Sequence, residues 1–452
     1  MSPGDAALIL FGTFCLLILL RVPVAFALGL ACLPIMAFNP RLTPILMMGE
    51  MTKAYNAFIL LAVPFFLLSA NIMNSAGITD RLIDVTKCIV GQFRGGLAYI
   101  NVVVSMIFAG ISGSSTADAA GEGSIIIPAM KKQGYDTSFT VAITACSSVI
   151  GVIIPPSILM VVWGGVLNTS VGGMFLGGFI PGTMVGLSQM IAVYFYAKRR
   201  NYPVYARATF KEFGQSVWAA LAALMTPIII IGGVVGGFVT PTEAAVVAVL
   251  YSFGVGLAIH RSMGLREIKD VLYNTTRLAS ISLFCIGTAS AFGWCMAYYQ
   301  LPKLVVATLS QYGVGITSVG LIEAAAFLFI GCFIDAVPAI IIIAPLLAPL
   351  AKTVGMHPIH FGIIGVISLA FGLVTPPYGL CLLIDVSIAK TTVAHVLKDA
   401  TEASYQRSTF LTEGDDDADK ADKPGKRWRM MDDWTRYATQ RSAEVIKIGK
   451  RA

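Results

Sequence analysis

Charged residues are scarce in this sequence. Asp, Glu, Lys and Arg make up 13% of the 452 residues, whereas 56% are hydrophobic and the mean hydropathy is +0.78. A soluble globular protein carries about 25% charge. Residues 137–197 contain none of the four charged types, and about 20 helical residues cross a bilayer core of roughly 30 Å. The composition excludes an ordinary cytosolic enzyme and predicts an all-α polytopic protein embedded in a lipid bilayer.

Signatures of several other protein classes are also missing. The eight cysteines form no C-x-x-C pair, so we interpret them as small buried hydrophobic residues. No P-loop is present, which is consistent with a carrier that does not use ATP. The net charge of +7 is spread over short loops and gives no basic face for nucleic acid. The first apolar run lacks a basic start and a cleavage site, so we expect a retained membrane segment rather than a signal peptide.

Long apolar segments fill most of the chain, and several are too long for one crossing. Gly and Pro interrupt them, and broken backbone at membrane depth survives only when protein buries it or when it lines a polar cavity. Charged loops are expected at 198–211 and 261–277, and two spans between them would place both loops in the cytoplasm. The apolar segments are 6–38, 54–76, 97–130, 138–168, 172–197, 216–239, 240–259, 276–299, 314–350 and 361–388.

The sequence contains an internal repeat. A shift of 221 residues superimposes glycines, prolines and a lysine of one half on those of the other, including a Pro-Pro pair. Paired interrupted segments in corresponding halves indicate the binding site of a secondary transporter. We therefore predict a permease domain over 1–404, with repeat halves at about 54–200 and 276–390, and a hydrophilic tail over 405–452. The superimposed pairs are Gly110/Gly331, Pro128/Pro349, Lys131/Lys352, Gly134/Gly355, Gly151/Gly372, Pro155/Pro376 and Pro156/Pro377.

A cluster of hydroxyl side chains interrupts the first half at 112–116 and is followed by Asp118. Polar groups in a membrane segment usually face a cavity or a partner. Hydroxyls and freed carbonyls are suitable ligands for a small cation, and the N-termini of half-helices attract a carboxylate. The alternative is close helix packing by small residues, which also uses Ser and Gly.

Each half also carries a Pro-Pro break beside a hydroxyl, at 151–157 and 372–378. Proline frees the carbonyl four residues back, so each pair could expose carbonyl oxygens, although a simple kink is the alternative. Asp335 is the second buried acid of the repeat. A further polar break at 240–243 is interpreted as a helix cap. Glu323 and Asp385 are given no role.

At these motifs the sequence resembles the large permease subunit of the TRAP (tripartite ATP-independent periplasmic) transporters. The matching blocks are GISGSSTADAAGEGSIIIPAMKKQGYD, IGVIIPPSILMVVWG, TPTEAAVVAVLYS and GCFIDAVPAIIIIAPLLAP with HFGIIGVISLAFGLVTPPYGL, over roughly residues 1–400. The resemblance implies a duplicated helical-hairpin, elevator-type secondary transporter of the bacterial or archaeal inner membrane. It would couple sodium to uptake of a small organic acid (C4-dicarboxylate, sugar acid or keto acid). Its partners would be a small four-helix membrane subunit and a periplasmic solute-binding protein.

The resemblance also implies site residues, including those of at least two sodium sites. The first sodium site carries over to Ser112, Ser115, Gly151, Ile154 and Pro156. The second carries over to Gly331, Gly372, Thr375 and Tyr378. The residues expected near the substrate are Ser114, Asp118, Ser157 and Asp335.

Three features depart from the family pattern. Glu122 and Val152 stand where the family usually has a small or apolar residue and a proline, and either could tune substrate choice. The third departure is the tail, because residues 413–452 hold 19 of the 57 charged residues where the family has another apolar span. We expect 412–426 to be disordered and 428–448 to form a short amphipathic helix.

The sequence leaves two alternatives to a transporter, an intramembrane serine protease and a channel. An intramembrane serine protease would use the G-x-S-G sequence at 110–113, but a serine nucleophile needs a general base within reach. The four histidines, His260, His357, His360 and His395, lie at span ends, in a loop or near the tail. An ion or solute channel could also contain a duplication, although paired hairpins with Pro-Pro breaks favour alternating access. We therefore expect a transporter and not an enzyme.

Overall fold

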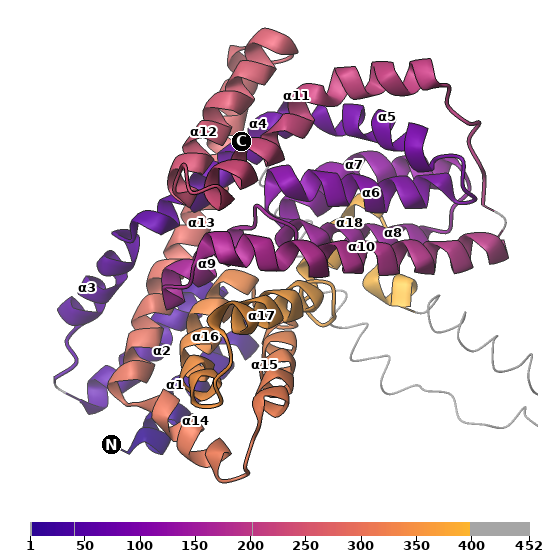
Figure 1. Ribbon diagram of the computed structural model, residues 1–452. Coiled ribbons are helices and arrows are strands. Elements are labelled where there is room, and N and C mark those ends of the chain that lie inside the picture. The colour runs from indigo at the N-terminus through magenta and orange to yellow at the C-terminus, as the bar shows by residue number, and fades with distance from the viewer. Residues whose placement is uncertain (1, 40, 201, 398–452) are drawn as a thin grey trace, which may run out of the picture.

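The computed structural model describes residues 2–39, 41–200 and 202–397, and every regular element in these ranges is helical (Figure 1). The predicted all-α fold class is confirmed. The helices are α1 (Pro3–Leu19), α2 (Val24–Phe38), α3 (Pro44–Tyr55), α4 (Ala62–Ser75), α5 (Ile78–Val90), α6 (Gly96–Ser112), α7 (Ser115–Lys132), α8 (Thr137–Ser148), α9 (Ile158–Leu167), α10 (Val171–Arg200), α11 (Phe210–Val235), α12 (Pro241–Gly254), α13 (Leu265–Tyr298), α14 (Leu301–Ser310), α15 (Ile316–Gly331), α16 (Ala336–Thr353), α17 (Pro358–Gly372) and α18 (Leu380–Ala389), with short turns at Phe58–Leu61, Val149–Val152 and Val255–Ile259.

Six helical stretches of the described chain are long and apolar enough to cross a membrane. The other apolar helices of the described chain have 10–17 residues. Each of the long expected segments at 97–130, 138–168, 314–350 and 361–388 is divided into two helices. The breaks fall at the Gly-Ser cluster, at the two Pro-Pro pairs and at the stretch from Gly331 to Asp335. The six stretches are Phe58–Ser75, Val171–Arg200, Phe210–Val235, Pro241–Ile259, Leu265–Tyr298 and Ala336–Thr353.

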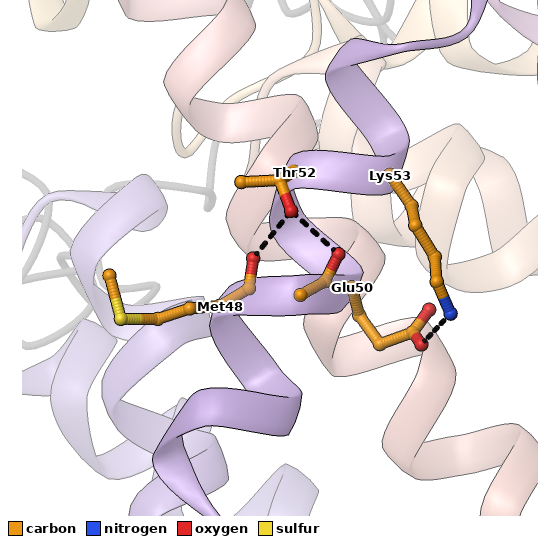
Figure 2. Close-up of polar contacts among 5 residues, drawn as sticks. Met48, Glu50, Thr52 and Lys53 are labelled. Carbon is orange, nitrogen blue, oxygen red and sulfur yellow. Dashed lines mark hydrogen bonds and ion pairs between the residues drawn. The ribbon is translucent and has the colours of Figure 1, made fainter.

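The 34-residue helix α13 forms the centre of one side of the molecule, where it packs against α2, α3, α4 and α16 (Figure 1). Helix α3 lies along its outer side and is held in shape by contacts within the helix. The Thr52 hydroxyl donates to the carbonyls of Met48 and Gly49 at 3.1 and 2.9 Å, and Lys53 Nζ pairs with Glu50 Oε1 at 2.5 Å. Figure 2 shows how Met48, Glu50, Thr52 and Lys53 lie on the helix. Such local bonds support a helix of only 12 residues.

The 221-residue shift also relates helix boundaries. Helices α7 and α16 end at Lys132 and Thr353, and α8 and α17 begin at Thr137 and Pro358. The glycines that follow α7 and α16 are both left-handed. Each half therefore holds a hairpin (α6–α7 or α15–α16) followed by a broken helix (α8–α9 or α17–α18).

The two halves exchange partners across the molecule. The second arm of the first hairpin, α7, packs against α18 of the second half, and α16 packs against α9 of the first. Helix α18 also packs against α8. This exchange brings residues near 120 and near 385 into one interface.

One expectation is corrected and one is confirmed. The charged stretch 261–277 is not a loop, because α13 begins at Leu265 and Glu267 caps its start by accepting from the Gly264 N–H at 2.9 Å. The apolar run 6–38, which is too long for one crossing, is two helices, broken where Arg21 is left-handed. The expected cap at 240–243 is confirmed, because Thr240 and Glu243 form a capping box. The expected tail structures at 412–426 and 428–448 lie outside the described residues.

Candidate functional site

A cavity of about 450 Å³ lies where both halves meet the α4–α13 side of the molecule. Helix α7 contributes several of its hydroxyls, at Ser114, Ser115, Thr116 and Ser124. Two asparagines of α4, Ser282 of α13 and Asp335 at the start of α16 complete the polar wall. The volume is within the range of small-molecule sites, about 300–1,000 Å³.

The tip of the first hairpin closes against the break between α8 and α9. Gly113, with φ 63°, allows the chain to turn from α6 into α7, and its carbonyl accepts from the Ile158 N–H at 3.1 Å. A Cβ on Gly113 would lie 2.7 Å from the Pro156 carbonyl oxygen. Only glycine fits here, because the conformation is left-handed and the neighbour is backbone.

Four of the five residues expected at the first sodium site converge on this tip. Ser112 and Ser115 are buried, and the Pro156 carbonyl faces Gly113. Gly151 faces the Asp118 carboxylate, since a Cβ on Gly151 would lie 1.9 Å from Asp118 Oδ2. The fifth expected residue, Ile154, lies on the same break, and its side chain packs against Gly182 of α10.

The residues expected at the second sodium site lie where α15 and α17 end. A Cβ on Gly372 would lie 2.8 Å from Gly331 Cα, so the two backbones touch. The Tyr378 N–H donates to the Cys332 carbonyl at 2.9 Å, which ties the second break to the second hairpin. The Thr375 hydroxyl donates to the Phe371 carbonyl at 2.7 Å.

The residues expected near the substrate divide into two pairs. Ser114 and Asp335 line the cavity, and both cap helices: the Ser114 hydroxyl accepts from Ala117 N–H at 3.4 Å, and Asp335 Oδ1 accepts from Ala336 N–H at 2.8 Å. Asp118 and Ser157 do not line it. Asp118 is fully buried against Gly151. The Ser157 hydroxyl donates to the Val152 carbonyl at 2.6 Å and accepts from the Met160 N–H at 3.3 Å.

Several lining residues were missed by the sequence reasoning, notably Asn71 and Asn74. Asn71 Nδ2 donates to the Thr275 hydroxyl of α13 at 2.9 Å, and Asn74 Oδ1 accepts from Thr79 at 3.0 Å. Two amides in an otherwise apolar span satisfy the criterion that located Ser112–Thr116, because a polar group in a membrane segment usually faces a cavity or a partner. Ser282 carried no comparable signal.

The positive potential of the cavity comes from backbone rather than from basic side chains. No Lys, Arg or His of the described chain lines it. Instead, the first residues of three helices do: Ser115 and Thr116 of α7, Ile158 of α9, and Ala336 of α16. The N–H groups of Ala117, Ile158 and Ala336 bond within the protein, so these ends act on an anion through the positive ends of their helix dipoles, about half a charge each. Their convergence favours an anion, whereas the Asp335 carboxylate in the same wall opposes one when it is ionised.

No histidine lies at the cavity that contains the serine cluster, so the lining offers no imidazole base for a serine nucleophile. Within the described ranges, no group of three or more His, Cys, Asp or Glu side chains could hold a metal ion. The duplicated hairpins, the broken helices and the central cavity define a polytopic membrane transporter.

The comparisons with known proteins give the family. Residues 11–402 match the family model described as "Tripartite ATP-independent periplasmic transporter, DctM component". The chain belongs to this family, the large permease subunits of TRAP transporters, as the sequence resemblance predicted. It is a multi-pass permease subunit of the inner membrane and not an enzyme.

The names of several relatives specify different organic acids. The chain is 37% identical to the C4-dicarboxylate TRAP transporter large permease protein of Pseudomonas aeruginosa, over 80% of this chain and 85% of the relative. It is 37% identical to the sialic acid large permease protein of Vibrio cholerae (74% and 78%) and 34% identical to the 2,3-diketo-L-gulonate large permease protein of Escherichia coli (85% and 91%).

A solved structure shares the fold. The YdaH transporter of Alcanivorax borkumensis superimposes with a TM-score of 0.51 at 14% identity, over 80% of this chain and 85% of that chain. At this identity the likeness extends to the fold alone.

Proposed function

We propose that this permease takes up a small organic acid together with sodium ions, without ATP, across the inner membrane. The substrate class is C4-dicarboxylate, sugar acid or keto acid, and the named substrates of the relatives above support an acid. A periplasmic solute-binding protein delivers the substrate, and a small four-helix membrane subunit completes the complex. The hairpins and the cavity between them move together as an elevator.

The observation that carries this proposal is the lining of the cavity. Three helix N-termini face it, and none of the basic side chains in the described part of the chain does. An organic anion therefore needs further positive charge in order to enter so apolar an environment. Sodium bound at the hairpin tips supplies that charge, and this makes binding of the ion and of the anion mutually dependent.

The proposed sodium ligands are oxygens of hydroxyls and carbonyls. At the first hairpin these belong to Ser112, Ser115, Gly151, Ile154 and Pro156. At the second hairpin they belong to Gly331, Gly372, Thr375 and Tyr378. Hard oxygen ligands in broken helices suit a small cation at membrane depth.

Coupling to at least two sodium ions explains accumulation without ATP. Two cations moving with one monocarboxylate carry one net positive charge inward. The membrane potential contributes about 2.3 kcal/mol per charge for each 100 mV, in addition to the sodium gradient. A dicarboxylate with two sodium ions would draw on the sodium gradient alone.

Sodium titration of the Ser115→Ala variant tests the first site. Ser115 is buried at the hairpin tip, so loss of its oxygen should raise the sodium concentration for half-maximal uptake at least several-fold. The control is Ser188→Ala, whose exposed hydroxyl bonds only to the Val185 carbonyl of its own helix. An unchanged sodium requirement in Ser115→Ala would show that Ser115 is not a ligand.

A further inference from the structure

Two buried acids face each other's helices at the α7–α18 interface, outside the cavity wall. Glu122 of α7 is 1% exposed; the Ser105 hydroxyl donates to its Oε2 at 2.7 Å, and no group of the described chain bonds to its Oε1. Asp385 of α18 is 0% exposed, and neither of its oxygens has a partner there. Asp385 Oδ1 lies against the backbone beside Glu122, since a Cβ on Gly123 would lie 2.6 Å from it.

Among the residues that the structure describes, no Lys, Arg or His acts on these two acids. The titratable groups that face them are Asp118 on α7, Cys381 on α18 and Cys146 on α8. Glu122 is close enough to Asp118 and Asp385 to be repelled by both if all three are ionised.

The remaining elements packed on α7 contribute neutral groups. Helix α6 contributes Ser105, and α4 contributes Asn74, which faces Gly121. The turn at Val149–Val152 contributes no titratable side chain. The nearest lysine of α7, Lys131, donates to the Ala389 carbonyl at 2.8 Å, more than two helical turns from Glu122. Beyond the acids lies a buried apolar cluster that includes Ile127, Val141, Ala145, Leu382 and Val386.

The fold itself does not require acids at this interface. The 221-residue shift relates the α7–α18 contact to the α16–α9 contact of the other half. At the positions that correspond to Glu122 and Asp385, that second interface has Ile343 and Gly164. The same packing therefore forms from apolar residues, and the two acids add a chemical property that only one half possesses.

We propose that Glu122 and Asp385 form a proton-binding site between α7 and α18. Two ionised carboxylates buried without a cation are costly, and a proton removes that cost directly. Within the described ranges the two acids join no group of three or more His, Cys, Asp or Glu side chains, which is the ligand set that a transition metal would use. A sodium ion in place of the proton would leave both carboxylates ionised, and the experiment below distinguishes the two. The site is distinct from the proposed sodium sites. Because α7 also carries Ser115, this proton makes the packing of the hairpin sensitive to pH.

Infrared spectroscopy of the full-length permease in lipid tests the site, because the carbonyl stretch of a protonated carboxylic acid is separate from the bands of a carboxylate. The variants are Glu122→Gln, Asp385→Asn and the double substitution, and each amide keeps the volume of the acid. We expect the acid band at neutral pH to be smaller in the double variant than in the wild type. The part of the acid band that the double variant lacks should disappear from the wild-type spectrum in alkali and return on reacidification.

The exposed acid Glu243 provides the control, because Glu243→Gln should leave the acid band unchanged and reduce the carboxylate band. If the double variant loses carboxylate bands instead of acid bands, both groups are ionised and the proposal is overturned. In each single variant, the loss of acid band or of carboxylate band shows whether the acid that was replaced is protonated or ionised in the wild type. The result therefore does not depend on the folding of the double variant. No sodium or substrate is needed, so the outcome is independent of the proposed sodium coupling.

Discussion

Gly372 touches Gly331 backbone to backbone: a Cβ on Gly372 would lie 2.8 Å from Gly331 Cα. The contact joins the end of α17 to the end of α15, where the residues proposed for the second sodium site meet. A similar close contact closes the first hairpin, where Gly113 meets the Pro156 carbonyl, although the repeat does not relate these two residues to Gly331 and Gly372. Both hairpin tips are therefore closed by glycines whose neighbours are backbone atoms that cannot move aside.

The first prediction is that Gly372→Ala lowers sodium-dependent uptake at least tenfold. The added methyl group forces apart two backbones, and overpacking of this kind costs about 1–3 kcal/mol. The control is Gly232→Ala in α11, where a Cβ would meet nothing within 4 Å. Uptake and the thermal stability of the purified protein measure the effect; wild-type uptake in Gly372→Ala would contradict the close contact.

The second prediction concerns the charge of the cavity. Ser282 lines it from α13, and Ser282→Asp would place a carboxylate in a wall that lacks basic side chains. Two like charges about 5 Å apart at an effective dielectric constant of about 20 repel by about 3 kcal/mol. We expect the substrate concentration for half-maximal uptake to rise at least tenfold, with a smaller change in the neutral variant Ser282→Asn. Equal effects of Asp and Asn would mean that no anion approaches this wall.

The third prediction concerns a buried polar network between α6 and α8. Asn101 Nδ2 donates to the Thr144 hydroxyl at 2.7 Å, and Asn101 Oδ1 accepts from Ser147 at 3.2 Å. Asn101→Ala leaves both hydroxyls without this partner and should destabilise the protein by about 1–2 kcal/mol. The measurement is the unfolding midpoint in detergent, with Ser188→Ala as the exposed control. An unchanged midpoint would show that the network does not stabilise the fold.

The fourth prediction is a pH dependence at the loop between α7 and α8. Burial alone would raise the pKa of Asp136, but hydrogen bonds from Tyr202 and Arg200 outweigh it and hold this pKa below its usual value. A lowered pKa in the folded state stabilises the protein above the unfolded value, about 3.9. This stabilisation is lost as the pH falls through the folded pKa.

The wild type should therefore be more stable than Asp136→Asn at neutral pH, and the difference should vanish in strong acid. Because the pair is partly exposed, the gap should not exceed about 1 kcal/mol. Melting of both proteins between pH 2 and 7 measures it. A gap that stays constant over this range would mean that the charge of Asp136 is not responsible.

The sequence predicted where helices break better than it predicted which helices meet. The Pro-Pro pairs and the Gly-Ser cluster mark breaks because their backbone chemistry is local, and the 221-residue repeat located both hairpins. The pairing of α7 with α18 is a long-range contact with no local signal, so Asp385 looked isolated although it faces the backbone beside Glu122. Helix packing also placed Asp118 and Ser157 away from the cavity wall, which periodicity alone could not predict.

The central claim is that uptake is driven by sodium, and one measurement tests it most directly. The permease, its small membrane subunit and its binding protein are reconstituted in liposomes, with a panel of C4-dicarboxylates, sugar acids and keto acids as substrates. An inward sodium gradient with the potential and pH clamped should drive accumulation of one of these acids above its external concentration. Accumulation that persists equally when sodium is replaced by potassium would contradict the account.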